Sequence, residues 1–500
     1  MFTWIIVLIV LFLIHNFYWK RRHLPPGPMP LPFVGNLLEF LRHPPGEQIQ
    51  LEWYKKYGKI FTIWMGREPM VVVADFDLIV DTFQKDGAAY EGRPNEVEYM
   101  NLVRGGAHGV IFSEGQTWSQ LRRFSLHTLR DFGLGKNLMQ ERILDEIKTL
   151  FRRVNSEIQT NNGLVGLDEL VDLSVGSIIN SLMFNYSYTD DKISEFMDLK
   201  LRAQSFMKSS GHPSQRLIRT RPNFYRHLPY FKQRLEDARD STNYLFDFFR
   251  QRIDEHSREL NQNNLLDAEP SDFTMAYLKE QRKREEQGET ELFNYRTLTS
   301  LLFDLWVAGQ ETTSNTIGWA MALLVCNSDV ERKAHEELDK VINSDRLITL
   351  EDKLHLPYIT AIVQESQRLA NLLPINLIHR TTRDVKIENH FLPQGTWITP
   401  QVSVLMCNPE IYPNPEKFQP ERFIDENGKL KRADELLPFS IGRRQCLGIN
   451  LAVLELFLFI ANLLNQYKLS PAGKLPSLER QHGVTVRINS YQCRMEKRFK

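Results

Sequence analysis

The stretch that decides the fold is PFSIGRRQCLG, which runs from Pro438 to Gly448. It places Cys446 among glycines and arginines in a chain of 500 residues with only 4 cysteines. Three interpretations of this thiol are open: a buried core cysteine, half of a disulfide, or a ligand whose sulfur faces a bound group. The other cysteines, Cys326, Cys407 and Cys493, form no CxxC pair, so neither a disulfide framework nor a zinc site is indicated.

The residues around Cys446 suit a loop that passes under a flat cofactor. Gly442 and Gly448 allow the backbone a close approach, and Arg444 adds a donor near the sulfur. The apolar sequence from Leu447 to Leu464 predicts a helix that begins directly after the cysteine. A helix N-terminus and a neighbouring guanidinium both favour thiolate over thiol. The pattern favours a ligand, and the alternative is a buried structural cysteine.

The FxxGxRxCxG pattern of residues 439–448 resembles the iron-binding loop of the cytochrome P-450 family, the haem-thiolate monooxygenases. The resemblance implies that Cys446 is the axial ligand of the iron in haem b. The similarity covers the entire chain, and LRDFG (129–133) and AGQETT (308–313) are similar to the microsomal enzymes of family two. It implies a mostly α fold, the helical P-450 prism with a small β-rich region.

A second signature lies in a long apolar segment, where residues 308–313 match the family's oxygen-binding AGxET sequence. Ala308 and Gly309 would open a groove beside the cofactor. Glu311 and Thr312 supply an acid and a hydroxyl, a pair that can relay protons. The alternative is that the glycine only kinks the helix while the threonines bond to backbone carbonyls. The resemblance implies that Glu311 and Thr312 are the catalytic residues.

A third signature is ExxR. Glu365 and Arg368 lie three residues apart, where opposite charges on one helix face can touch. The resemblance implies a buried ion pair that is closed by Arg422 of the PERF segment (420–423). Because a buried charge network is costly when one member is lost, we predict a structural role for all three.

Haem carries two propionates, which need cations and hydrogen-bond donors. The resemblance assigns them to four residues: Trp118 and Arg122, spaced WxxxR on a helix, together with His379 and Arg444. There is one departure from the family, because microsomal relatives often carry an arginine at the position of Gly106. Arg104 is the candidate substitute.

The beginning of the chain predicts a membrane anchor. Residues 1–22 include an almost uninterrupted apolar run, long enough to cross a bilayer, which ends in Lys20, Arg21 and Arg22. These cations should stay on the cytosolic side. A cleaved signal peptide is the alternative, but no small residues precede a cut site. We predict a proline-rich extended hinge over residues 23–36, a single catalytic domain over residues 37–500, and location on the endoplasmic reticulum membrane with the body in the cytosol.

Helical periodicity dominates the body. It predicts helices over residues 140–156, 168–184, 235–258, 298–325, 330–342 and 358–369. Short strands are predicted over residues 59–64, 69–73, 397–399 and 484–488. Surface loops are predicted over residues 159–163 and 259–272, and an irregular stretch over residues 380–420.

Equal numbers of acidic and basic residues, 62 of each, argue against nucleic acid as a partner. The resemblance implies that one atom of O2 enters a lipophilic substrate, such as a fatty acid, a steroid or a xenobiotic. No dinucleotide fingerprint is present, so NADPH should act through a partner, NADPH-cytochrome P-450 reductase, with cytochrome b5 as a second candidate donor. Four cations could form the face that meets the reductase: Arg122, Arg123, Arg130 and Lys136.

Two other classes of function remain open at this point. A haem-thiolate isomerase or dehydratase would keep Cys446 without activating O2. A non-catalytic haem-binding protein would need no basic face for a reductase. The presence of both Glu311 and Thr312 favours the monooxygenase.

Overall fold

A computed structural model describes residues 2–133, 137–262 and 265–499 of the chain. The α-helices are α1 (Phe2–Phe17), α2 (Leu37–Arg42), α3 (Glu47–Tyr57), α4 (Phe76–Ile79), α5 (Val97–Arg104), α6 (Gly115–Asp131), α7 (Asn137–Thr160), α8 (Leu167–Phe184), α9 (Ile193–Gly211), α10 (Ser214–Thr220), α11 (Pro222–Tyr225), α12 (Pro229–Gln262), α13 (Phe273–Glu286), α14 (Tyr295–Cys326), α15 (Ser328–Val341), α16 (Pro357–Ala370), α17 (Val402–Met406) and α18 (Ile449–Gln466). Short helical turns are η1 (Trp19–Arg21), η2 (Val80–Lys85), η3 (Gly87–Tyr90), η4 (Asp190–Lys192), η5 (Leu265–Asp267), η6 (Leu350–His355) and η7 (Pro420–Phe423).

The strands are short and form three small sheets. They are β1 (Ile60–Met65), β2 (Glu68–Val73), β3 (Leu164–Val165), β4 (His379–Arg380), β5 (Val385–Ile387), β6 (His390–Leu392), β7 (Trp397–Pro400), β8 (Tyr467–Pro471) and β9 (Cys493–Lys497). The largest sheet has the order β1-β2-β7-β4, in which β2 and β7 run parallel and the other pairs are antiparallel. The other two sheets are β3-β9-β8 and β5-β6.

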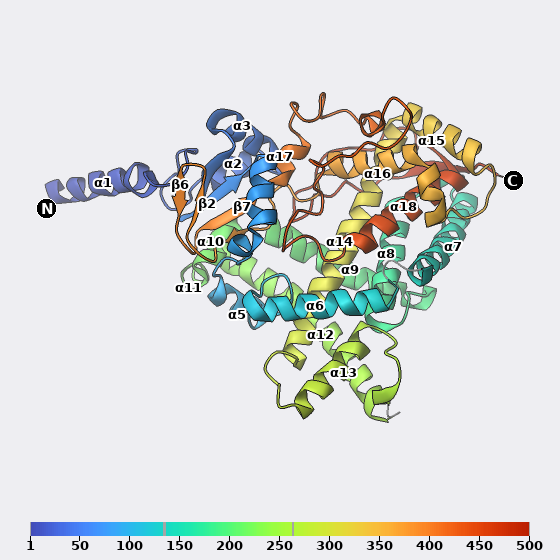
Figure 1. The fold of residues 1–500 in the computed structure, drawn as a ribbon, viewed down its shortest axis with the longest axis horizontal. Helices are drawn as coiled ribbons and strands as arrows, with labels where there is room; N and C mark the ends of the chain where they lie inside the picture. The colour runs from blue at the N-terminus through green and yellow to red at the C-terminus, as the bar shows by residue number, and fades with distance from the viewer. Residues whose placement is uncertain (1, 134–136, 263–264, 500) are drawn as a thin grey trace.

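Helix α14 forms the centre of the molecule, and Figure 1 shows it running through the helical body behind α6. It packs against α8, α12, α16 and α18. Asn294 caps the N-terminus of α14, because its side chain accepts a hydrogen bond from the Thr297 N–H. Its sequence is apolar on most of its circumference, as expected for a helix buried on all sides. The largest apolar core cluster surrounds it.

The predicted helices are confirmed, and most extend slightly beyond their predicted ends. They correspond to α7, α8, α12, α14, α15 and α16. Two of the predicted loops are partly helical, because α7 continues to Thr160 and α12 to Gln262. The stretch predicted to be irregular, residues 380–420, contains β5, β6, β7 and α17. The predicted strand over residues 484–488 is wrong: only an isolated bridge joins Gln481 and Arg487 there.

Helix α1 projects away from the body (Figure 1). Its apolar side chains from Trp4 to Ile14 are exposed, which is expected of a helix that belongs in lipid and not in water. The segment Thr3–Arg21 is long and apolar enough to cross a membrane. Helix α18 passes the same test, but most of it is buried in the core.

The segment after α1 is extended and lies against the body. Arg21 Nη2 donates to the Gly27 carbonyl at 2.8 Å, and Asn16 Nδ2 donates to the Pro30 carbonyl at 3.1 Å. The Thr62 N–H of β1 donates to the Pro26 carbonyl at 2.9 Å. A Cβ atom at Gly27 would lie 1.9 Å from the Thr62 carbonyl oxygen, so the close contact with β1 requires glycine. The proline-rich segment thus joins the helix to the edge of the main sheet.

Glu365, Arg368 and Arg422 meet in the interior. Arg368 donates to both oxygens of Glu365 at 2.7 and 2.9 Å, and Arg422 Nε donates to Glu365 Oε1 at 3.0 Å. The Gln419 N–H donates to the same oxygen at 3.0 Å. Arg368 also donates to the carbonyls of Met406 and Pro415 at 2.8 and 2.7 Å. This network ties α16 to the chain that precedes the Cys446 loop.

Glu365→Gln should destabilise the protein by about 3 to 5 kcal/mol, because it leaves two arginines without their buried counter-charge. The free energy of unfolding measures this. Glu336→Gln is the matched control, since Glu336 pairs with Arg332 on the surface and both side chains are more than half exposed. The control should change stability by less than about 1 kcal/mol. Equal effects of the two substitutions would contradict the structural role.

Candidate functional site

The loop that carries Cys446 is fixed by backbone contacts. The Cys446 N–H donates to the Phe439 carbonyl at 3.0 Å, and the Gln445 N–H donates to the Gly442 carbonyl at 3.0 Å. Gly442 has a φ of +79°, and a Cβ atom there would lie 1.8 Å from the Phe83 carbonyl oxygen. Only glycine fits this position, because it meets both the left-handed backbone and the contact with η2.

Cys446 lies just before α18, and Gly448 is the N-terminal cap residue of that helix. All four cysteines are free, so the disulfide interpretation is excluded. Cys446 is exposed on one side, unlike a core cysteine, yet the surrounding protein is dense enough that burial raises its pKa. The Gly448 N–H and the Arg122 charge act in the opposite direction and lower the pKa. The thiolate-favouring groups predicted from sequence are present but are outweighed by burial; a bound metal ion would reverse that balance.

Arg122 contacts this loop from α6, and Arg444 is a member of the loop itself. Arg122 Nη2 donates to the Gln445 carbonyl at 2.7 Å. Arg444 donates to the carbonyls of Glu91 and Ser113, both at 2.8 Å, and its guanidinium lies 4.0 Å over the ring of Trp118. Trp118 and Arg122 come from α6, so the WxxxR spacing places both side chains toward the Cys446 loop.

His379 joins this group from β4. Its Nδ1 lies 2.8 Å from the Tyr90 carbonyl, and an acceptor there means that Nδ1 carries the proton. The side chain is buried, and burial with the charges of Arg93 and Arg444 holds its pKa well below the ordinary value. His379 is therefore neutral in this arrangement.

Arg93 is a member of the group that sequence reasoning missed. Its Nε donates to the Ile111 carbonyl and its Nη1 to the Ile378 carbonyl, both at 2.9 Å. It comes from the turn after η3, and no spacing rule marks it. The proposed substitute, Arg104, does not join the group; its guanidinium pairs with Asp304 at 2.6 Å.

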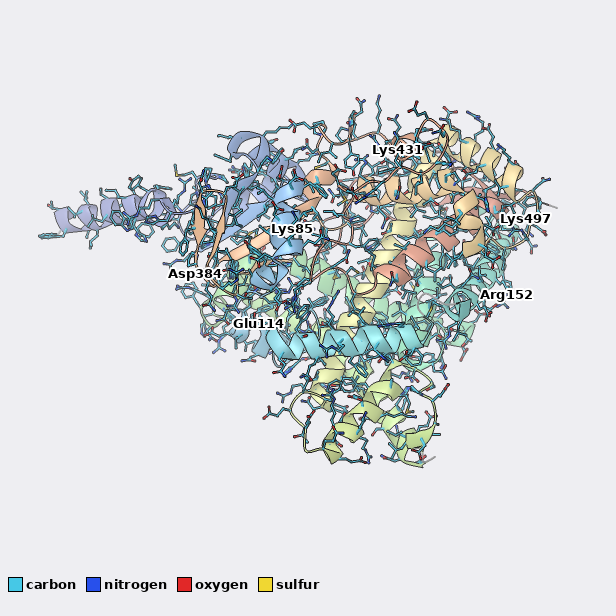
Figure 2. All side chains as sticks on the ribbon, in the orientation of Figure 1. Lys85, Glu114, Arg152, Asp384, Lys431 and Lys497 are labelled. Atoms are coloured by element: carbon cyan, nitrogen blue, oxygen red, sulfur yellow. The ribbon has the colours of Figure 1, made fainter. Side chains whose placement is uncertain are left out.

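The cations around Trp118 repel one another. Burial and the charge of Arg93 lower the pKa of Arg444 to about 8, with Arg122 adding to the effect. Burial lowers the pKa of Arg93 to about 10. Because a guanidinium stays protonated in proteins, these shifts report the cost of burying the two cations, to which repulsion from Arg93 and Arg122 adds at Arg444, and not lost protons. Glu114 pairs with Arg380 at 2.6 and 2.7 Å, and its charge also raises the pKa of Arg93 and Arg444. Figure 2 shows Glu114 at the end of α6 nearest the sheet. A ligand with two carboxylates fits the remaining charge.

Helix α14 has one accessible stripe inside an otherwise buried surface. Between Thr297 and Val325, the residues that are not buried are Leu305, Ala308, Gly309 and Thr312. Their spacing of three and four residues places them on one face of the helix. The opposite side of Gly309 packs on Ile179 of α8, where a Cβ atom would lie 2.6 Å from the isoleucine side chain. The stripe is a flat, small-residue surface that can lie beside a planar ring.

Glu311 is buried next to this stripe within a group of charges. Arg487 Nη1 lies 3.3 Å from Glu311 Oε2, and Arg487 Nη2 lies 3.7 Å from Asp172 Oδ2. Asp172 also pairs with Lys200 of α9. Burial raises the pKa of Glu311 to about 7; Arg487 opposes the rise and Asp172 adds to it. An acid with this pKa can both give and take a proton near neutral pH.

Thr312 donates its hydroxyl hydrogen to the Ala308 carbonyl at 2.8 Å. This is the back-bonding that the structural alternative predicts. The hydroxyl keeps its lone pairs as acceptors, and Thr312 belongs to the accessible stripe. This hydrogen bond thus fixes the Thr312 side chain and leaves its hydroxyl oxygen able to accept another hydrogen bond.

A thiol ligand, a cationic group suited to two carboxylates and a flat helix stripe together fit a haem with a cysteine ligand, and they define a haem-thiolate protein. The comparisons agree: residues 25–495 match the family model described as "Cytochrome P450". The chain belongs to the cytochrome P450 family, and the predicted P-450 fold and monooxygenase class are confirmed.

The curated relatives are members of P450 family 2. Cytochrome P450 2A3 of Rattus norvegicus is 33% identical over 455 residues, which cover 90% of this chain and 88% of the relative. Cytochrome P450 2B15 of the same species is 34% identical over 90% of this chain and 87% of the relative. Cytochrome P450 2C16 of Oryctolagus cuniculus is 32% identical over 95% and 93%.

Arg122→Gln should speed the loss of haem by about tenfold, because it removes a charge next to Cys446 and the donor that holds the Gln445 carbonyl. Transfer of haem to excess apomyoglobin measures the rate. The neighbouring Arg123 is exposed, and Arg123→Gln should leave the rate unchanged. A rate in Arg122→Gln equal to that of the control would remove Arg122 from the haem-binding residues.

Proposed function

We propose that this P450 monooxygenase inserts one atom of O2 into lipophilic substrates, with electrons supplied from NADPH by a flavoprotein reductase. The observation that carries the proposal is that Glu311, whose pKa is raised to about 7, is adjacent in the sequence to Thr312, which lies on the accessible stripe of α14. A proton donor at this position is required when the second oxygen atom leaves as water.

The cofactor in this proposal is haem b. When bound, it supplies oxygen activation at an iron whose thiolate ligand favours cleavage of the O–O bond. Cys446 would be its ligand, and Trp118, Arg122 and Arg444 would hold the propionates, with Arg93 adding charge. His379 can donate to a propionate only after it gains a second proton, which a neighbouring carboxylate would favour.

Glu311 and Thr312 act on protons. Thr312 Oγ1 has acceptor capacity and can hold a water or an oxygen atom beside the ring. Glu311 can release a proton toward Thr312 and regain one through the charged groups behind it, Arg487, Asp172 and Lys200. Each group has a polar neighbour, so no member of this path is an isolated buried charge.

The substrate class follows from apolar surroundings. Leu305 and Ala308 lie on the accessible side of α14, and both side chains are apolar. The end of α9 lies against the turn at residues 483–484: the Val484 N–H donates to the Met207 carbonyl at 3.0 Å, and a Cβ atom at Gly211 would lie 2.1 Å from Gly483. Fatty acids, steroids and lipophilic foreign compounds suit such a site.

The reductase and the endoplasmic reticulum membrane belong to the proposal as well. An exposed apolar N-terminal helix followed by cations supports a single-pass anchor with a cytosolic body. Of the cations predicted to meet the reductase, Arg123 and Arg130 are exposed, whereas Arg122 points to the Cys446 loop. Lys136 lies outside the described residues. Cytochrome b5 stays a second candidate donor.

The proposal predicts that the haem-loaded protein, with reductase and NADPH, forms products that carry label from heavy-isotope oxygen gas. A panel of fatty acids, steroids and lipophilic drugs is assayed by mass spectrometry. Cys446→Ala should abolish both the products and the carbon monoxide difference band near 450 nm that is typical of thiolate ligation.

The outcomes separate the three classes of function. Product without label would favour the isomerase or dehydratase, and the absence of turnover with the whole panel would favour the non-catalytic haem protein. Survival of the carbon monoxide band in Cys446→Ala would exclude Cys446 as the ligand.

Arg487→Gln should move the pH dependence of turnover upward by about one unit, because loss of the cation disfavours the Glu311 carboxylate and raises its pKa further. Turnover that needs protonated Glu311 falls as the pH rises through its pKa, near 7 in the unaltered protein. Product formed per NADPH is measured between about pH 6 and 9. Arg494→Gln, an exposed site on β9, is the control and should not move the profile. An unchanged midpoint in Arg487→Gln would exclude Glu311 as the titrating acid.

A further inference from the structure

A pocket of about 410 Å³ lies where α5, α12 and the first turns of α14 meet. None of its lining residues is among those assigned to the haem or to proton transfer. Four arginines line it, and we call it the arginine pocket: Arg104, Arg239, Arg250 and Arg296. Its size is that of sites for small organic molecules, which are typically about 300 to 1,000 Å³.

The charge of the arginine pocket is one-sided. Its 12 lining residues include four arginines, and no aspartate or glutamate is among those that the structure describes there. Asn101 and Asn243 add neutral amide donors. A concave surface lined by one sign of charge concentrates its potential and attracts ions of the opposite sign.

Acidic neighbours outside the pocket neutralise three of the four arginines only weakly, and the fourth, Arg104, is paired with the buried Asp304. Arg239 lies 3.7 Å from Asp240, and Arg250 lies 2.9 Å from Asp247, but these pairs are about half or more exposed to solvent. Exposed pairs of this kind contribute little. Arg296 has no carboxylate within 4 Å in the described part of the chain. Burial lowers the pKa of the nearby His108, and the charge of Arg296 lowers it further.

Arg104 is the buried member of the pocket. Its side chain is only 3% exposed, and Nη2 donates to Asp304 Oδ1 at 2.6 Å. Asp304 Oδ2 already accepts the N–H groups of Val110 and Ile111, both at 2.9 Å. Nε and Nη1 of Arg104 are buried and have no acceptor among the described residues. These two donor atoms lie beneath the surface of the pocket, so Arg104 acts on an anion there through its charge and not through a hydrogen bond.

One wall of the arginine pocket is apolar. Leu102, Val103 and Phe246 line it, and Phe246 meets Phe303 edge to face with ring centres 5.4 Å apart. Phe303 also lies under the Arg104 guanidinium, at 4.8 Å. The wall can therefore take an apolar body while the arginines take a charged head.

We propose that the arginine pocket binds a small organic anion, a carboxylate, sulfonate or sulfate carried on an apolar body. This goes beyond the proposed function, because the ligand contacts neither the Cys446 loop nor the accessible stripe of α14. The negative head lies among Arg104, Arg239 and Arg296, and the apolar part lies against Phe246.

The test uses the full chain loaded with haem and the probe naphthalene-2-sulfonate, with binding measured by isothermal titration calorimetry. Clotrimazole is present to block the space above the iron. We expect one site per chain, and Arg239→Gln/Arg296→Gln should weaken binding by about tenfold or more through the loss of two cations. Both residues are exposed, so the variant should fold normally, and its carbon monoxide spectrum verifies this.

Two controls isolate the arginine pocket. Arg258→Gln changes an exposed arginine of α12 outside the pocket and should leave the affinity unchanged. The neutral analogue naphthalene-2-methanol should bind the unaltered protein and the double variant alike. Equal affinity of the sulfonate for both proteins, no binding at all, or loss of binding when clotrimazole is present would overturn the proposal. None of these readouts depends on turnover, so the proposed monooxygenase activity stands or falls separately.

Discussion

The buried carboxylate of Glu365 holds the chain that leads to the Cys446 loop, and the arrangement of the site depends on this interaction. It accepts hydrogen bonds from Arg368, Arg422 and a backbone N–H, and the two arginines donate in turn to carbonyls of the chain between α17 and η7. That chain has little regular structure of its own, so its path is set by these bonds and not by a helix or a sheet. The segment after η7 leads on to the Cys446 loop, which begins at Pro438, so the path of the chain toward the loop starts from this network.

The two charged regions near the haem position are compensated in different ways. Around Trp118, the arginines donate mainly to backbone carbonyls, which satisfy their hydrogen bonds but not their charge. Around Glu311, positive and negative side chains alternate, so the net charge is small and a proton can move at low cost. The first region suits a permanent anionic ligand, and the second suits a group that changes its charge during turnover.

The sequence predicted those parts that depend on local pattern. The Cys446 loop, the Glu365–Arg368 pair and the long helix α14 can each be recognised from residues that are close together in the sequence. Arg93 and Arg487 were missed because their roles arise from contacts between segments distant in sequence, and neither lies in a spaced motif. The strand expected at residues 484–488 failed for a related reason: its alternating pattern was present, but in the part of the chain that the structure describes it forms only the bridge between Gln481 and Arg487 and no ladder with a partner strand.

The repulsion among the cations near Trp118 couples the cofactor to folding. A folded chain bears this electrostatic cost, whereas an unfolded chain separates the charges in water and does not. A ligand that removes the cost on binding stabilises only the folded state, by an amount that grows with its free concentration. Under the proposed assignment of these arginines to haem, the quantity of folded protein in a cell should therefore follow the local supply of haem.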